Sequence, residues 1–286
     1  MRGEILEACV ASTESKVETL EASDGVGLYV ESHGTGVPVI FSCGYCTTHE
    51  NWRPQVEPLV AAGYRVVLHD FRGHGLSESP ADASAYSMAQ VIDDLSRVIN
   101  WASPDQPAVL AGHSFGGLAS LHYAAQNKDR VRALVLLATG PGFKKPEAAQ
   151  KWEAQCERTA RFLEERGVGA FLAGRAGETC VGRRPELPDA QAAAEAIAKQ
   201  DTSGLALFGR KIAGTAPPIM DELPGLTCPA LVLVGEEDKA YLRAADVMEA
   251  KLGQAQSKAL PGVGHVANLE DPAVFNAQVL DFLAAL

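Results

Sequence analysis

The chain has 286 residues, of which 47% are hydrophobic and 21% are charged, and its net charge is −11 with a pI of about 5.1. This length fits one large α/β domain or a core with an inserted segment, and the apolar content is high enough to exclude global disorder. The acidic balance disfavours a nucleic-acid partner, because an acidic surface repels phosphate backbones and no run of Lys or Arg offsets it.

The first 16 residues are expected to form a polar extension. Glu4, Glu7 and Glu14 interrupt their apolar residues, which is not the pattern of a secretory signal. No segment reaches the ~18 unbroken apolar residues that a membrane span needs. The six cysteines are scattered through the chain without the spacing of a disulfide scaffold. Free thiols, a reducing compartment and a cytoplasmic location are therefore predicted.

Strand and helix signals alternate after the extension. Short apolar runs, several of them bounded by glycine or polar turns, predict strands over 27–30, 38–41, 64–68, 108–111 and 131–137. Apolar residues at helical spacing predict a helix over 87–101 with Ser87 as its N-cap, and a second helix is expected over 118–125. Strands that alternate with helices favour a parallel sheet with helices on both faces.

The composition changes between about 142 and 222, where helical patterns replace strand-like runs. Strand character returns at 229–234 and 258–260, with helices expected around 243–252 and over 272–286. The helical block thus interrupts the strand pattern and is interpreted as a cap, or lid, over one end of the sheet. The predicted organisation is an extension over 1–16, a core over 17–141 and 223–286, and a helical cap over 142–222.

The strand at 108–111 continues into Gly112-His113-Ser114-Phe115-Gly116-Gly117, a Gly-x-Ser-x-Gly pattern between a strand and a helix. A turn this tight leaves no room for side chains at the two flanking glycines. Ser114 is then expected at the apex, above the positive end of the following helix. Ser114 is the predicted nucleophile, and the alternative is a structural turn whose serine has no catalytic role.

A serine nucleophile needs a base, and the base needs an orienting carboxylate. His265 lies in a glycine-flanked loop after the last predicted strand and is the predicted base. Among the other six histidines, His113 is expected to face away from the active side. Asp238 best fits the expected position of the carboxylate after a late strand, with Glu236 and Glu237 as alternatives. The chain order serine, aspartate, histidine is one that a strand–turn–helix architecture of this kind uses.

Four segments resemble the α/β-hydrolase superfamily: GHSFGG, HDFRGHGLSESP, VLVGEEDKAY and LPGVGHVANLEDP. The sequence is most similar to its lid-bearing group of carboxylesterases, enol-lactonases and cofactor-free haloperoxidase or perhydrolase-type enzymes. This resemblance implies an α/β fold with a mostly parallel eight-stranded sheet and an inserted helical cap. It implies neither a cofactor nor a metal, and it disfavours dehalogenation and epoxide opening, whose branches carry Asp where Ser114 stands.

The resemblance also locates an oxyanion hole. The family usually has His-Gly-x after its third strand, and this chain has Cys43-Gly44-Tyr45. By position, the backbone N–H groups of Tyr45 and Phe115 would bind the oxyanion. Cys43 and Cys46 form a Cys-x-x-Cys, which is open to three other readings: a redox dithiol, half of a metal site, or a disulfide. Two free thiols are the favoured interpretation, since one such pair supplies only two of zinc's four ligands.

The predicted function is hydrolysis of carboxylic esters through a Ser-His-Asp triad and an acyl-enzyme. Alternatives with the same triad are a lactonase, an amidase, a carbon–carbon bond hydrolase or a perhydrolase, and a non-catalytic ligand-binding protein is a further alternative. The expected partner is a small-molecule ester, with no nucleic acid and no membrane, for a monomer or homodimer. Candidate pocket residues are Trp152, Phe162, Phe171 and Phe208, although aromatics at helical spacing are more often simply core.

Overall fold

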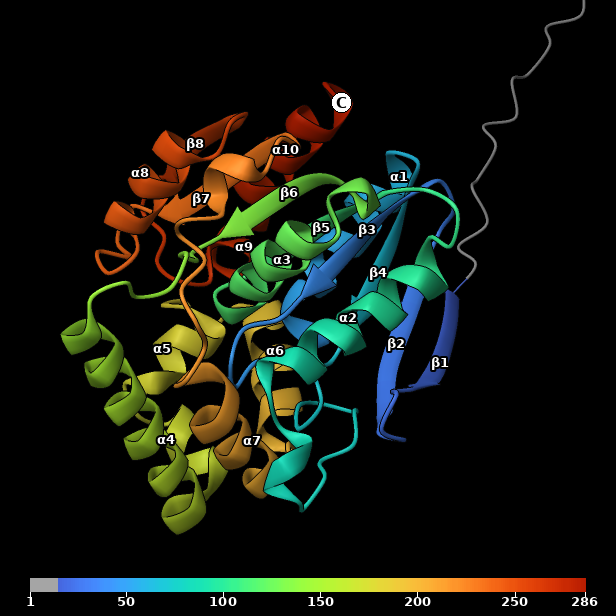
Figure 1. The fold of residues 1–286 in the computed structure, drawn as a ribbon. Helices are drawn as coiled ribbons and strands as arrows, with labels where there is room; N and C mark the ends of the chain where they lie inside the picture. The colour runs from blue at the N-terminus through green and yellow to red at the C-terminus, as the bar shows by residue number, and fades with distance from the viewer. Residues whose placement is uncertain (1–14) are drawn as a thin grey trace, which may run out of the picture.

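The computed structural model describes residues 15–286, which form one eight-stranded sheet in the order β1-β2-β4-β3-β5-β6-β7-β8 (Figure 1). The strands are β1 Ser15–Glu21, β2 Gly27–His33, β3 Val37–Ser42, β4 Tyr64–His69, β5 Ala108–His113, β6 Val131–Leu137, β7 Ala230–Gly235 and β8 Ala255–Leu260. The β1–β2 and β2–β4 pairs are antiparallel, and every other pair is parallel. The predicted α/β fold with a mostly parallel eight-stranded sheet is confirmed.

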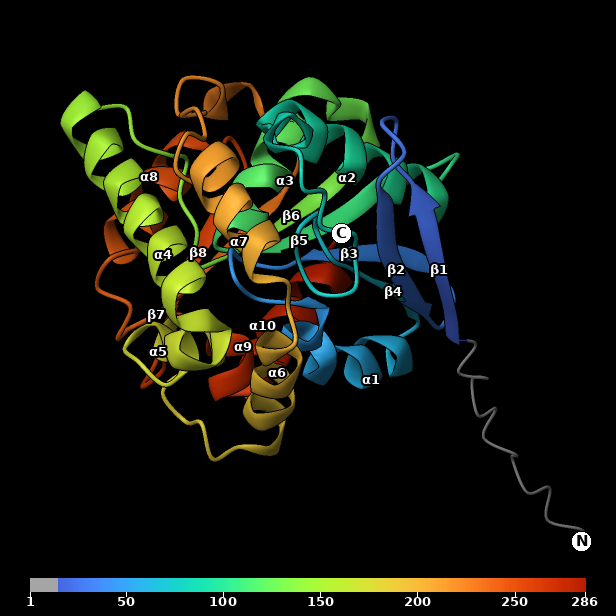
Figure 2. The same cartoon turned by 90° about the horizontal axis from the view of Figure 1, so that it is seen from below.

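Helices cover both faces of the sheet (Figures 1 and 2). Side chains alternate between the two faces, so that Val39 and Phe41 pack with α1, α9 and α10, while Ile40 between them packs with α2, α3 and α8. The core helices are α1 Arg53–Ala61, α2 Met88–Ala102, α3 Phe115–Gln126, α8 Leu242–Lys251, α9 Ala267–Glu270 and α10 Pro272–Ala284, with the short helices η1 His49–Trp52, η2 Ala83–Ala85 and η3 Lys128–Arg130.

The segment between β6 and β7, here called the insertion, contains helices and no strand. Figure 1 shows it beyond the carboxyl ends of the parallel strands. Its elements are α4 Pro146–Leu172, which is interrupted at Gly167, α5 Ala176–Val181, α6 Pro188–Ala198, α7 Thr202–Phe208, the π-helix η4 Gly209–Ala213 and η5 Leu223–Gly225. An inserted helical block was expected from the sequence, and the boundaries at 142 and 222 stay a prediction.

The predicted N-terminal extension, residues 1–16, needs one correction. β1 begins at Ser15, so the last two of these residues belong to the sheet, and residues 1–14 lie outside the described part of the chain. The sequence pattern hid β1 because it is an edge strand with mostly exposed side chains.

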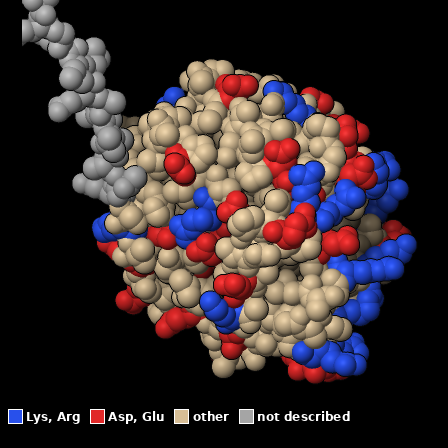
Figure 3. Space-filling model, turned by 180° about the vertical axis from the view of Figure 1, so that it is seen from behind, with Lys and Arg blue, Asp and Glu red and all other residues tan. Residues whose placement is uncertain are grey.

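Two further properties concern the surface and membranes. Acidic and basic side chains are interspersed over the face shown in Figure 3, with lysine and arginine gathered along one side. The acidic excess therefore does not form a uniform field on that face. Among the described residues, no helix has both the length and the apolar character required to span a bilayer.

Candidate active site

Ser114 lies at the junction of β5 and α3 in a strained backbone conformation, with φ 51° and ψ −115°. Few non-glycine residues adopt a positive φ, and such strain is typical of functional positions. The turn requires its glycines, since a Cβ on Gly112 would lie 2.4 Å from the carbonyl carbon of Gly116, and one on Gly116 would lie 2.3 Å from the Ser42 carbonyl oxygen. The result is a partly exposed serine at the N-terminus of a helix.

His265 and Asp238 are in direct contact. The Nδ1 of His265 lies 2.7 Å from the Oδ2 of Asp238, and both side chains are largely buried. Because a carboxylate only accepts hydrogen bonds, Nδ1 carries the proton and Nε2 is left free to accept one. Asp238 follows β7 and His265 follows β8, two neighbouring parallel strands. Neither Glu236 nor Glu237 makes this contact.

His113 connects the nucleophile turn to the histidine loop. Its Nε2 donates to the backbone carbonyl of His265 at 3.0 Å, and the two rings lie 4.7 Å apart between centroids. Burial lowers the pKa of His113 well below its usual value, so this ring is neutral and structural. The contact ties the loop of His265 to the residue that precedes Ser114, and the expectation that His113 faces away from the active side stays a prediction.

Tyr241 is a site residue that the sequence analysis missed. Its ring lies 4.9 Å from that of His265, and its side chain contacts that of Ser114. Burial raises the pKa of Tyr241, and the contact with Ser114 acts in the opposite direction. Tyr241 thus touches both the predicted nucleophile and the predicted base. The available signal was its position at the end of VLVGEEDKAY, three residues after Asp238, where the Tyr241 N–H donates to the Asp238 carbonyl at 3.0 Å in a tight turn.

Within residues 15–286, the backbone N–H groups of Tyr45 and Phe115 are unpaired at the position where the sequence predicts an oxyanion hole. The N–H of Gly44 donates to Thr47 Oγ1 at 2.7 Å and that of Cys46 to His74 Nε2 at 3.1 Å, whereas the N–H of Tyr45 has no acceptor among the described residues. Phe115 is the first residue of α3, so its N–H has no partner within the helix.

Cys43 and Cys46 are free, fully buried thiols and form no disulfide. Burial raises the pKa of both thiols, which keeps them protonated and unreactive. The two side chains pack into different apolar clusters, Cys43 with Phe115 and Cys46 with Val266. The interpretation as two free thiols fits, and the disulfide reading is wrong.

The four candidate pocket aromatics divide into two groups. Phe208 is fully buried and lies 5.0 Å from Phe115 and 6.0 Å from Tyr45 between ring centroids, and Trp152 packs against the same cluster. Phe171 belongs to a neighbouring cluster, and Phe162 is 41% exposed with Phe171 as its aromatic contact. The structure therefore brings Phe208 and Trp152 to the site and does not bring Phe162 there.

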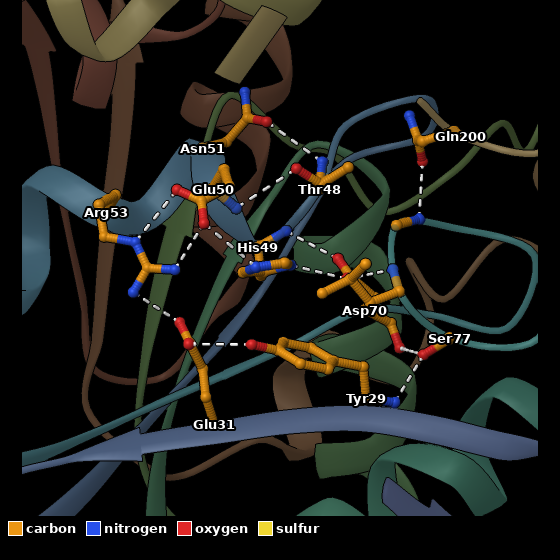
Figure 4. Close-up of polar contacts among 12 residues, drawn as sticks. Tyr29, Glu31, Thr48, His49, Glu50, Asn51, Arg53, Asp70, Ser77 and Gln200 are labelled. Atoms are coloured by element: carbon orange, nitrogen blue, oxygen red, sulfur yellow. Dashed lines mark hydrogen bonds and ion pairs between the residues drawn. The ribbon is translucent and has the colours of Figure 1, made fainter. Parts of the chain in front are cut away.

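A buried charged network lies at the end of the loop of residues 43–48 between β3 and η1, here called the Tyr45 loop (Figure 4). Asp70, fully buried, accepts from the backbone N–H of His49 at 2.7 Å and pairs with the imidazole Nδ1 at 2.7 Å. Glu50 lies 3.3 Å from the other ring nitrogen, and Arg53 joins Glu50 to Glu31. His49 is the centre of this network and is only 4% exposed.

The network predicts a stability that depends on pH. Burial lowers the pKa of His49, but Asp70, Glu50 and Glu31 outweigh this effect and raise the pKa to about 9. Because the folded pKa exceeds the unfolded value of about 6.5, the stabilisation is complete below about pH 6.5 and is lost as the pH rises through about 9. The shift corresponds to about 3 kcal/mol. Urea unfolding at pH 6.5 and 9.5 measures the free energy of unfolding, which should fall more between these pH values in wild type than in His49→Gln. Equal losses in the two proteins would contradict the stabilising role of protonated His49.

Comparison with known proteins agrees with this geometry. A family model described as alpha/beta hydrolase fold matches residues 37–272. The chain therefore belongs to the α/β-hydrolase family, and it is a hydrolase of this fold.

Particular relatives span different shares of the chain. The structure of a thermophilic esterase from Thermogutta terrifontis is similar with a TM-score of 0.79 and 27% identity, over 95% of this chain and 98% of that one. The enol-lactonase from Burkholderia xenovorans LB400 gives a TM-score of 0.77 and 25% identity, over 93% and 100%. An epoxide hydrolase from Caballeronia sordidicola is 36% identical over 113 residues, a local match that takes in 40% of this chain and 34% of the relative.

Proposed function

We propose that the protein hydrolyses carboxylic esters through Ser114, His265 and Asp238. The observation that carries the proposal is the 2.7 Å contact between His265 and Asp238, on a loop whose His265 carbonyl accepts a hydrogen bond from His113, the residue before the strained Ser114. A base in this tautomer is ready to accept the serine proton. The full-length similarity to a solved esterase supports this choice of substrate class.

In the proposed reaction, His265 Nε2 takes the proton of Ser114 as the serine oxygen attacks the ester carbonyl. The charge that develops on the carbonyl oxygen is stabilised by the N–H groups of Tyr45 and Phe115. Asp238 holds the imidazole and stabilises its charged form, and His265 then protonates the departing alcohol. Water repeats these steps on the acyl-enzyme and releases the acid.

The insertion would supply the pocket for the substrate's apolar part. Phe208 and Trp152 come from the insertion and pack against the cluster that contains Phe115. Their apolar, aromatic surfaces favour an uncharged acyl or alcohol group. A lactone is the second candidate substrate, supported by the similarity to the enol-lactonase over that protein's whole length. The same attack opens a cyclic ester without releasing a separate alcohol.

A fluorophosphonate probe tests the proposal, because it reacts only with an activated serine. We expect wild type to bind one probe per chain, with the adduct on the peptide that contains Ser114, and His265→Ala to bind almost none. His122→Ala is the matched control, since His122 contacts the Pro217 carbonyl away from the triad and should label like wild type. Absence of label on wild type would exclude the serine mechanism. Rates on matched open-chain and cyclic esters separate the two substrate classes.

A further inference from the structure

The loop that carries the Tyr45 N–H is held under strain. Cys46, the next residue, has a φ of 67°, a conformation that costs a non-glycine residue about 1–3 kcal/mol. Its N–H donates to His74, and its carbonyl accepts from Gln200 Nε2 at 3.1 Å. Gln200 comes from the insertion, between α6 and α7, and its Oε1 accepts from the Gly75 N–H at 2.9 Å. One insertion side chain therefore holds two core loops.

A second contact with the insertion comes from Tyr45 itself. The Tyr45 hydroxyl donates to the backbone carbonyl of Leu205 in α7 at 3.1 Å, and its ring stacks on Phe208 with centroids 6.0 Å apart. Burial raises the pKa of Tyr45, so the hydroxyl keeps the proton that it donates. Gly209 makes the approach possible, since a Cβ there would lie 2.1 Å from the tyrosine hydroxyl oxygen.

These contacts hold the Tyr45 side chain and the backbone of the next residue, Cys46, so they restrain the segment that directly follows the Tyr45 peptide N–H. We propose that Tyr45 is a positioning residue whose hydroxyl, bound to the Leu205 carbonyl, aligns its own backbone N–H for the oxyanion through α7 of the insertion. This inference rests on the proposed function and assigns a part of the proposed oxyanion hole to the insertion. The insertion then affects the rate of the chemical step as well as the shape of the pocket.

The hydroxyl contributes little to folding in this account. The Leu205 carbonyl also accepts the N–H of Gly209, so it keeps a hydrogen-bond partner when the phenol is removed. In Tyr45→Phe, the phenylalanine ring is expected to keep the packing of the tyrosine ring. Loss of the hydroxyl therefore changes the orientation of the Tyr45 N–H. The hydrogen bond from this N–H is strongest in the transition state, when negative charge develops on the substrate oxygen.

The test compares Tyr45→Phe with Tyr86→Phe. Tyr86 is the matched control, because its hydroxyl is also buried but has no hydrogen-bond partner among the described residues. With a short aryl ester, Tyr45→Phe should lower kcat by about tenfold and change KM by less than about twofold, since only a transition-state interaction is weakened. Affinity for an aryl trifluoromethyl ketone, which forms an oxyanion adduct with an active-site serine, should fall by the same factor. Tyr86→Phe should resemble wild type in both measurements.

Gly209→Ala reaches the same contact from the other partner. The added methyl group displaces the phenol, so the kcat of Gly209→Ala should fall by a similar factor. In the double variant Tyr45→Phe/Gly209→Ala, kcat should fall by less than the product of the two single effects, because both changes remove the same contact. The positioning role is overturned if Tyr45→Phe has wild-type kcat, or if its kcat falls while its affinity for the ketone is unchanged. In either case the proposed function still holds as long as wild type is labelled by the fluorophosphonate. Wild type that neither labels nor turns over esters overturns the proposed function and the positioning role together.

Discussion

Replacing Ser114 with alanine is expected to reduce kcat for a soluble aryl ester by at least about 10⁴-fold, with little change in KM. Alanine removes the only atom that can form the acyl-enzyme, while the two oxyanion donors and the pocket remain. A residual rate above that of water would come from these remaining groups. Initial rates over a range of ester concentrations measure both constants.

Ser120→Ala is the matched control for this experiment. Ser120 lies in the same helix, α3, and its buried hydroxyl donates to the Gly116 carbonyl at 2.8 Å. Loss of that hydrogen bond should cost about 1 kcal/mol of stability and leave kcat within about twofold of wild type. If Ser114→Ala turned over the ester at the wild-type rate, the assignment of Ser114 as the nucleophile would be wrong, and the proposed mechanism with it.

Replacing Asp238 with asparagine should reduce kcat by about 10⁴-fold at neutral pH. The Oδ2 of Asp238 lies 2.7 Å from Nδ1 of His265, and an amide can present an N–H there instead of an acceptor. The imidazole then carries its proton on Nε2, the atom that must take the serine proton. Fluorophosphonate labelling should slow by a comparable factor, which shows that the loss is in serine activation rather than in product release.

Glu237→Gln is the control for this substitution, because Glu237 was an alternative carboxylate one position away. Its side chain is exposed and lies 3.9 Å from that of Lys239. We expect wild-type kinetics from this variant. A large loss in Glu237→Gln with near-normal Asp238→Asn would transfer the orienting role to Glu237.

The fold and the three triad candidates could be predicted from the sequence because each has a local signature. Buried strands show as short apolar runs, and the turn at Ser114 needs glycines at fixed positions on either side. Strand β1 and helix α1 escaped prediction for a physical reason, since β1 is exposed at the sheet edge and α1 has only two buried residues. The hydrophobic periodicity that predicts a strand or helix is weak where few of its side chains are buried.

Contacts between distant segments could not be predicted. The spacing of Cys43 and Cys46 is the same in a reactive and an inert pair, and only the depth of burial distinguishes them. Gln200 belongs to no recognised motif, and the segment that ends at Tyr241 specifies no contact with Ser114, so both roles arise from where the insertion and the start of α8 pack. Phe162 shows the opposite case, since an aromatic residue in a helical pattern can face solvent.

The two hydrogen bonds from the insertion to the Tyr45 loop limit how freely this enzyme can be re-engineered. A chimera that carries a relative's helices between β6 and β7 would lose the Gln200 side-chain amide and would change the position of the backbone carbonyl that Leu205 now presents. Such a graft would then alter catalytic power along with substrate choice, even though Ser114, Asp238 and His265 all come from outside the exchanged segment. On the proposed positioning role of Tyr45, exchanging the insertion would therefore change substrate range and turnover at the same time.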